Sequence, residues 1–172
     1  MKKTCGLFGL LILVAMETVM SAEVSTEKFV WTDLQKIGVE GKGWTDTENF
    51  YDRLPASAKD KVPQSVWNLS HNSAGMCARF VTAAPQIAVR WTLNSGCHMQ
   101  HMADTGISGV DLYGRDSASG WQYLGTGFPK GLGQKPPLCE KVFSAGGKTA
   151  REYLLYLPLY NGVTQVEIGV PE

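Results

Sequence analysis

One short segment holds the densest group of potential metal ligands in this 172-residue chain. Cys97, His98 and His101 bring a thiol and two imidazoles close together, and zinc accepts both kinds of ligand. Cys77 or Asp104 could supply a fourth ligand. Structural zinc sites commonly combine two paired ligand motifs, however, and only one such group is visible here. We therefore interpret the segment as a polar loop whose histidines bond backbone groups or a neighbouring domain, with a metal site as the alternative, and we expect no cofactor.

Two arginines form a second group that could bind a ligand. The predicted strand register places Arg79 directly opposite Arg90, and like charges paired across strands are unfavourable. The pair could hold an anionic ligand or a carboxylate of another domain. The interpretation that we favour is that Asp111 or Glu167 on adjoining strands neutralises it, because half-buried arginines usually find internal carboxylates.

Aromatic residues are numerous enough to build a platform on which a sugar could stack. The set comprises Trp44, Trp67, Trp91, Trp121, Tyr113, Tyr123, Tyr156 and Tyr160. Trp44 is flanked by glycine in a predicted loop, which makes it the best candidate for an exposed stacking residue. Burial of Trp44 in the core or between domains is an equal alternative. Side-chain alternation assigns Trp91 to the core.

These residues must be positioned by strands, and the first predicted pair joins residues 76–81 to residues 87–93 as a hairpin. In that register apolar residues face one another, with Ala78 opposite Trp91, and a slip of one residue would scatter them. The two arginines then meet on the other face of the sheet.

Two further hairpins follow from the same alternation of side chains. Residues 110–116 pair with residues 121–126 across a turn of small polar residues. Residues 153–157 pair with residues 166–170, and Asn161-Gly162 offers a type I′ turn between them.

The pattern as a whole predicts an all-β fold, an antiparallel β-sandwich of the jelly-roll type. Short strands with alternating apolar residues, separated by glycine, proline and asparagine turns, favour this architecture over a parallel α/β sheet. Residues 45–62 are predicted to form a loop with a short helical turn near residues 56–59.

The first 22 residues have the layout of a secretory signal. Lys2 and Lys3 precede an apolar stretch that is too short to span a bilayer, and Ser21 and Ala22 follow it. We expect cleavage near Ala22 and export to the periplasm or the extracellular space, with a retained anchor as the alternative. The formal net charge is +0 and no block of like charge occurs, so neither nucleic acid nor, after cleavage, a membrane is an expected partner.

Three cysteines lie beyond the signal, and an exported protein can form a disulfide. Cys97 and Cys139 both lie in connections that contain glycine or proline, so they are the candidate pair. Cys77 lies within a strand pattern and is interpreted as a small core residue.

With the strands placed, a family resemblance becomes visible. Residues 109–113, Gly-Val-Asp-Leu-Tyr, resemble the Gly-x-Asp-Leu-Tyr signature of the domain that precedes the catalytic domain in SGNH-hydrolase-type esterases. Five further segments are similar in sequence to the same family: residues 41–44, 51–55, 66–70, 73–76 and 152–162.

The resemblance implies a β-sandwich followed by a flavodoxin-like hydrolase domain that carries the nucleophile. This chain ends at Pro171-Glu172, about where that second domain would begin. We therefore expect residues 23–172 to be the N-terminal sandwich domain, with the catalytic SGNH domain absent.

The inventory of catalytic motifs agrees with that expectation. An SGNH hydrolase needs a serine activated by a histidine, an aspartate that orients the histidine, and donors for the oxyanion. Asp116-Ser117 follows an arginine rather than a glycine, and no Asp-x-x-His pair occurs. Ser108 is followed by Gly109 and then valine, so the Gly-x-Ser-x-Gly elbow is also absent.

These observations predict a non-catalytic accessory domain of an SGNH or GDSL-type esterase, with no enzyme activity of its own. Its expected partner is a hydrolase domain, and the resemblance implies acyl esters, such as acetylated carbohydrate, as substrates of full-length relatives. The alternatives are a stand-alone carbohydrate-binding module and a truncated esterase fragment without independent function. The residues singled out as ligand or domain contacts are Trp44, Arg79, Arg90, His98, His101, Asp111 and Tyr113.

Overall fold

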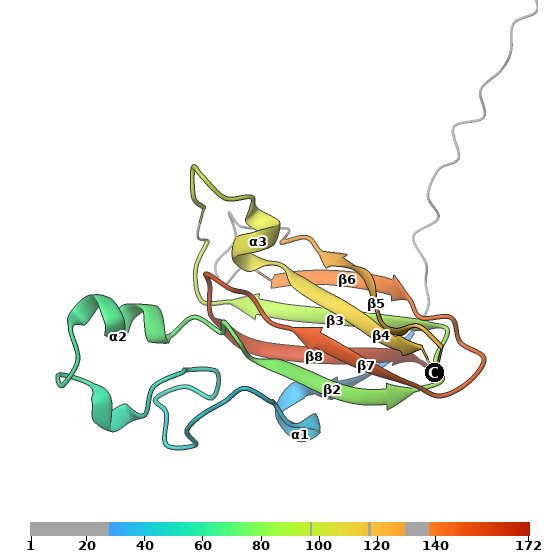
Figure 1. The fold of residues 1–172 in the computed structure, drawn as a ribbon, viewed down its shortest axis with the longest axis horizontal. Coiled ribbons are helices and arrows are strands. Elements are labelled where there is room, and N and C mark those ends of the chain that lie inside the picture. The colour runs from blue at the N-terminus through green and yellow to red at the C-terminus, as the bar shows by residue number, and fades with distance from the viewer. Residues whose placement is uncertain (1–27, 97, 117, 130–137) are drawn as a thin grey trace, which may run out of the picture.

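The computed structural model describes residues 28–96, 98–116, 118–129 and 138–172. Two four-stranded antiparallel sheets face each other across a single core (Figure 1). Their strand orders are β1-β8-β3-β6 and β2-β7-β4-β5. The predicted all-β antiparallel sandwich is therefore confirmed.

The elements have the following bounds. The first sheet contains β1 (Phe29–Asp33), β8 (Val163–Pro171), β3 (Gln86–Leu93) and β6 (Leu138–Ser144). The second sheet contains β2 (Cys77–Thr82), β7 (Arg151–Tyr156), β4 (Val110–Asp116) and β5 (Gly120–Gly127). Three short helices are α1 (Leu34–Ile37), α2 (Gln64–Ser70) and α3 (Asp104–Ser108). The helical turn predicted near residues 56–59 is present as a 3-10 turn at Ala56–Ala58.

Alternate side chains of both sheets fill the core. On β3 these include Val89 and Trp91, which are fully buried, and on β7 they include Leu155. Trp91 also donates its ring N–H to the Ser108 carbonyl at 2.9 Å, so its polar atom is satisfied inside the core. Burial of each large apolar side chain stabilises the fold by about 1.5 to 3 kcal/mol.

The first predicted hairpin is wrong, because β2 and β3 lie in different sheets. β2 pairs with β7, and β3 pairs with β6 and β8. Arg79 and Arg90 are therefore not opposite each other. The predicted core face is nevertheless correct, since Ala78 and Trp91 are both fully buried. A connection that crosses from one sheet to the other turns alternate residues of both strands to the same core, as a hairpin does, so alternation could not distinguish the two.

The third predicted hairpin is wrong for the same reason. β7 and β8 belong to opposite sheets, and Gly162 does not have the positive φ that a type I′ turn requires. Gly162 is needed instead for a close approach, because a Cβ there would lie 2.1 Å from the His71 carbonyl oxygen. The second predicted hairpin is confirmed as β4 and β5, with a bulge after Leu112.

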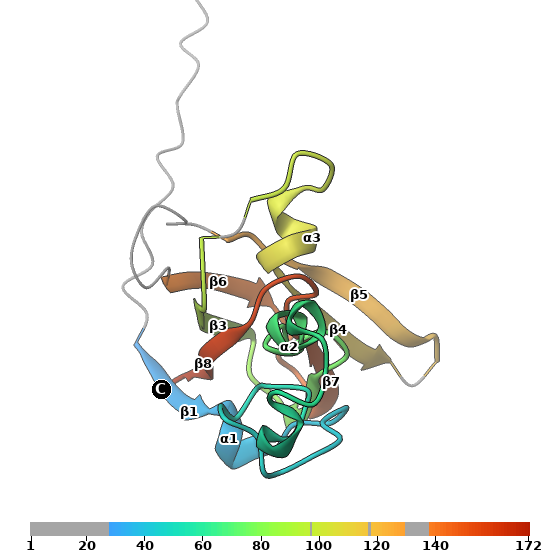
Figure 2. The ribbon, with the colours of Figure 1, turned by 90° about the vertical axis from the view of Figure 1, so that its left-hand side faces the viewer.

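Helices α2 and α3 and the longer connections that contain them lie at one end of the sandwich, whereas α1 lies along its side against β8 and β2 (Figure 1). Figure 2 looks onto this end, where the β7–β8 connection lies between α2 and α3. Among the described residues, no helix is long and apolar enough to cross a membrane.

Candidate functional site

Three of the predicted site residues share the outer surface of the second sheet. Arg79 lies on β2, while Asp111 and Tyr113 lie on β4. We term this surface the outer-sheet face. It comprises Arg79, Asp111, Tyr113, Arg115, Trp121, Tyr123, Glu152 and Tyr156, which the strand registers bring side by side.

The charged groups of the outer-sheet face neutralise one another. Arg79 Nε lies 2.8 Å from Glu40 Oε1, and its Nη1 lies 3.1 Å from Glu152 Oε1. The other Glu152 oxygen lies 3.0 Å from Arg115 Nη1. Hydrogen bonds from Arg115 and Arg79 lower the pKa of Glu152, and a hydrogen bond from Arg79 lowers that of Glu40. The predicted partner Asp111 is therefore wrong for Arg79.

Trp121 is flanked by the two arginines of this network. The Arg79 and Arg115 guanidinium carbons lie 5.4 and 5.9 Å from the centre of a Trp121 ring. A guanidinium at this range is attracted to the face of an indole. The indole is thus held in place while part of it remains exposed to solvent.

Asp111 and Tyr113 belong to the Gly-x-Asp-Leu-Tyr segment, and β4 turns both outward while Leu112 enters the core. The Asp111 carboxylate accepts a hydrogen bond from Thr126, which is itself hydrogen-bonded to the Tyr123 hydroxyl. The Tyr113 ring lies 5.5 Å from that of Tyr123 and also contacts Tyr156. The ring of Tyr113 is tilted by 59° and 83° against those of Tyr123 and Tyr156, and the resulting aromatic cluster could contact a sugar ring or pack against a protein.

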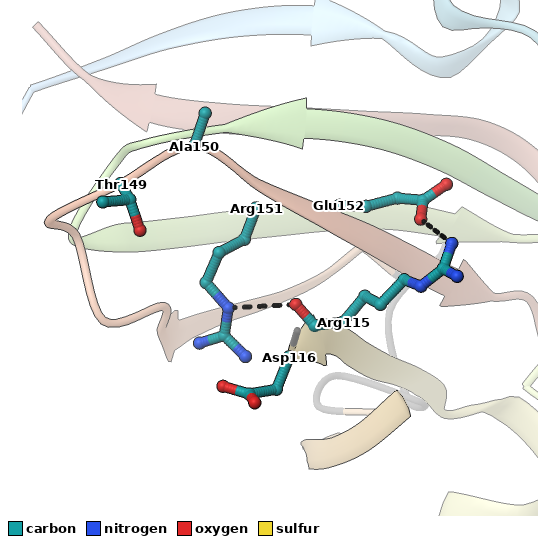
Figure 3. A pocket seen from close by; sticks show the side chains of 6 residues that line it. All are labelled: Arg115, Asp116, Thr149, Ala150, Arg151 and Glu152. Carbon is teal, nitrogen blue, oxygen red and sulfur yellow. Dashed lines mark hydrogen bonds and ion pairs between the residues drawn. The ribbon is translucent and has the colours of Figure 1, made fainter. Parts of the chain in front are cut away.

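A shallow hollow of about 360 Å³ borders the outer-sheet face (Figure 3). Arg151 reaches across it and donates from Nε to the Arg115 carbonyl at 3.3 Å. The Asp116 carboxylate accepts hydrogen bonds from two backbone N–H groups of the following turn, which lower its pKa. The residues that line the hollow thus carry charges of both signs, and these charged groups already form hydrogen bonds or ion pairs within the chain.

A second surface lies at the end of the sandwich that carries α2. We term it the loop-end surface, and it surrounds a hollow of about 300 Å³. Its residues are Arg53, Leu69, Asn72, Ala74, Leu159 and Tyr160. Leu69, Leu159 and Tyr160 are 54%, 51% and 44% exposed, which is high for such large apolar side chains.

Buried polar side chains hold the loops beneath this surface. Asn161, which is 2% exposed, donates from Nδ2 to the Ser95 carbonyl at 2.8 Å and to Ser108 Oγ at 3.0 Å. The fully buried Ser73 donates a hydrogen bond from its hydroxyl to the Pro158 carbonyl oxygen at 3.0 Å. The connections that follow α2, β3 and β7 and the end of α3 are therefore joined by hydrogen bonds, and those in the interior are costly to lose.

An aspartate and a histidine form a pair beside the loop-end surface. His71 Nδ1 lies 3.0 Å from Asp52 Oδ1, and Asp52 is almost completely buried. The other Asp52 oxygen accepts hydrogen bonds from the backbone and side-chain amides of Asn49. Within the part of the chain that the structure describes, no serine or cysteine side chain is hydrogen-bonded to His71, so the pair has no nucleophile to activate.

The remaining predicted residues do not join either surface. Arg90 lies on the outer side of the first sheet, 2.5 Å from Glu167 and 4.1 Å over a Trp31 ring, so the predicted neutralisation by Glu167 is confirmed for this arginine. Trp44 is exposed in the connection before α2. Its role as a stacking residue stays a prediction.

The histidines of the predicted polar loop also lie apart from both surfaces. His98 Nδ1 lies 2.7 Å from Asp104 Oδ1, and His101 is exposed. No group of three potential metal ligands occurs among the described residues. Cys97 lies outside those residues, so its predicted pairing with Cys139, which is buried in the core, remains a prediction. The predicted signal, residues 1–22, also lies outside them.

The sequence interpretation missed several residues of these surfaces. Arg115 was within its reach, because the β4–β5 register places it opposite Trp121, which the sequence analysis named only as one member of the aromatic set. Arg53, Leu159 and the buried Asn161 carried no such signal, since they come from connections whose meeting no periodicity describes.

Comparisons with known proteins assign the chain to a family. The structure resembles a crystal structure of a putative GDSL-like lipase from Bacteroides ovatus, with a TM-score of 0.75 and 29% sequence identity. The match covers 84% of this chain and 41% of the lipase chain, so this chain spans about two fifths of that protein. No curated protein matches the sequence. The family model for GxDLY, the N-terminus of SGNH-hydrolase-type esterases, matches residues 29–172, and the chain therefore belongs to this family of N-terminal esterase domains.

Proposed function

We propose that this chain is a non-catalytic accessory domain that works with an SGNH-type ester hydrolase domain and helps to shape or position its substrate. The observation that carries the proposal is the family match over residues 29–172, which assigns the sandwich to the N-terminal part of such esterases. Acetylated carbohydrate is the substrate class that we propose for the hydrolase. The signal-like layout of residues 1–22 supports export to the periplasm or the extracellular space.

The polar groups of the described residues support an accessory role. Ester hydrolysis of the serine type requires a serine nucleophile, a histidine base and an aspartate that orients the histidine, all in contact. His71 and Asp52 could supply the base and the orienting carboxylate, but the hydroxyls of the buried Ser73 and Ser108 are committed to other partners. The pair is better explained as a structural contact that joins the segment before α2 to the end of that helix.

The first test is the activity of the purified full chain on p-nitrophenyl acetate. We expect hydrolysis no faster than the buffer blank, unchanged by a serine-directed fluorophosphonate. A matched His71→Ala variant should behave identically. Hydrolysis that the serine reagent abolishes would show that the chain is an enzyme and would overturn the proposal.

A second candidate function is carbohydrate binding by the outer-sheet face. The observation in its favour is the set of partly exposed aromatic rings on a flat sheet, Trp121, Tyr123 and Tyr156. Titration with acetylated xylo-oligosaccharides, followed by tryptophan fluorescence, tests it. Binding that Trp121→Ala abolishes and Trp44→Ala preserves would establish this function, whereas no fluorescence change and no heat would remove it.

A further inference from the structure

We propose that the loop-end surface is the docking site of the SGNH hydrolase domain, and that Arg53 receives a carboxylate of that domain. This inference rests on the proposed function and adds the surface and its chemistry. Both candidate surfaces expose large apolar or aromatic side chains, but they differ in whether their arginines already have a carboxylate partner within this chain, and that difference selects the loop-end surface.

Arg53 has no carboxylate partner among the described residues. Its Nη2 donates to the Leu69 carbonyl oxygen at 2.5 Å, and its backbone N–H donates to the Ser70 carbonyl. Its Nε is buried and has no hydrogen-bond partner in the part of the chain that the structure describes. No ion pair of Arg53 occurs there either, whereas the guanidinium groups of Arg79 and Arg90 each meet a glutamate.

A guanidinium with unfilled donors favours a carboxylate, because the two groups match in charge and in fork geometry. A neutral donor group or a second cation would leave Arg53 uncompensated. The hollow beside Arg53 is otherwise lined by Asn72 and by the largely apolar residues Leu69, Ala74, Leu159 and Tyr160. The complementary surface is therefore a carboxylate that projects from an apolar segment.

The exposed apolar residues at this end have no explanation in strand alternation. Leu69 lies in α2 and Leu159 lies in a connection, so a polar residue could occupy either position without disturbing a sheet. The interior bonds of Asn161 and Ser73 hold the backbone that presents them. Rigid apolar side chains around one charged anchor are the composition of a protein-binding centre.

Family membership indicates which domain would bind to the loop-end surface. Sandwich domains of this family form the N-terminal part of SGNH-type esterases, and the match to the Bacteroides ovatus protein leaves more than half of that chain unaccounted for. A hydrolase domain is thus the partner that family membership supplies, and a carboxylate on an apolar segment is a feature that a folded domain can present.

The experiment measures binding of this full chain to the part of the Bacteroides ovatus protein that lies beyond the matched region, produced as a separate chain. Isothermal titration compares wild type with Arg53→Ala and Leu159→Asp. Trp121→Ala, on the outer-sheet face, is the matched control. We expect each loop-end variant to weaken binding at least about tenfold, as loss of a central contact does, and the control to bind like wild type. Arg53→Lys should give an intermediate loss, because it keeps the charge and removes the fork.

The variants are checked for folding by their thermal unfolding, and an unfolded Arg53→Ala is replaced by Arg53→Gln. Loss of binding in the control but not in the loop-end variants would overturn the docking site and leave the accessory function standing. Absence of binding by wild type would also overturn the docking site. Self-association that Leu159→Asp abolishes, measured by analytical ultracentrifugation, would assign the surface to a second copy of this chain instead. The accessory function itself fails only if the chain hydrolyses esters on its own.

Discussion

The outer-sheet face and the loop-end surface both combine aromatic or apolar side chains with arginine, yet they are built in opposite ways. On the outer-sheet face the polar contacts lie at the surface, where Arg79, Glu152 and Arg115 neutralise one another. At the loop end the polar contacts of Ser73 and Asn161 lie below the surface, and the half-buried Arg53 has no ion pair among the described residues.

This difference has an energetic consequence. Exposed ion pairs contribute about 0 to 1 kcal/mol to stability, because solvent screens the charges and two long side chains must be ordered. A buried hydrogen-bonding group that loses its partner costs about 1 to 3 kcal/mol. Substitutions beneath the loop-end surface should therefore affect folding strongly, whereas substitutions on the outer-sheet face should affect it weakly.

The largest effect is expected from Gly162→Ala. The added Cβ would lie 2.1 Å from the His71 carbonyl oxygen and from Asn94 Nδ2, so two connections would have to separate. We expect a loss of about 2 to 4 kcal/mol in the free energy of unfolding, measured by urea titration. Gly43→Ala is the matched control, because nothing lies within 4 Å of a Cβ built there. Equal stability of the two variants would show that the loop end is not tightly packed.

The next effect is that of Asn161→Ala. It removes the bonds to the Ser95 carbonyl and to Ser108 Oγ, and the Ser108 hydroxyl that loses this donor is buried. We expect a loss of about 2 to 3 kcal/mol, again by urea titration. Asn68→Ala, which removes an exposed bond to Gln64, should change stability by less than about 0.5 kcal/mol. A small effect of Asn161→Ala would mean that the interior network is not what holds the connections together.

Trp121→Ala tests the outer-sheet face. The indole gains cation–π attraction from two exposed arginines, which is worth about 0.5 to 1 kcal/mol at such sites. We expect a loss of about 1 kcal/mol or less in thermal or urea unfolding. A loss as large as that of Asn161→Ala would remove the distinction between the two surfaces.

The smallest effect concerns pH. Hydrogen bonds from arginine hold the pKa values of Glu40 and Glu152 in the folded chain below the usual value for glutamate, so their ion pairs stabilise the fold at any pH above that usual value. This contribution is lost as the pH falls through the folded-state pKa values. Glu152→Gln should thus be less stable than wild type at about pH 6, and the difference should narrow at about pH 3. A gap that stays constant across this range would show that the carboxylate charge contributes nothing.

Sequence reasoning was accurate wherever a local pattern carried the information. The β4–β5 hairpin was predicted with its turn, because both strands are joined directly and their pairing is local. The core positions of Ala78 and Trp91 were also predicted, since alternation alone assigns a side chain to one face. The pairing of Arg90 with Glu167 followed from the rule that a half-buried cation finds a carboxylate.

The pairing partners of four strands were not predictable in this way. β2 and β3 are neighbours in sequence, as are β7 and β8, yet each pair divides between the two sheets. Both a hairpin and a connection between sheets send alternate residues to one core, so the apolar pattern is the same in the two cases. The mistaken juxtaposition of Arg79 and Arg90 came from that degeneracy.

The sequence by itself determined the fold class, the family and the inward or outward direction of most strand residues. Side-chain alternation and short sequence motifs carry this information, because each is a local pattern over a few neighbouring positions. Only the tertiary structure decided which strands pair and that Arg53, Leu69 and Leu159 meet around one hollow. Arg53 comes from the connection before α2, Leu69 from α2 itself and Leu159 from the β7–β8 connection. The contacts that join them depend on buried hydrogen bonds between segments far apart in the chain, which no local pattern encodes.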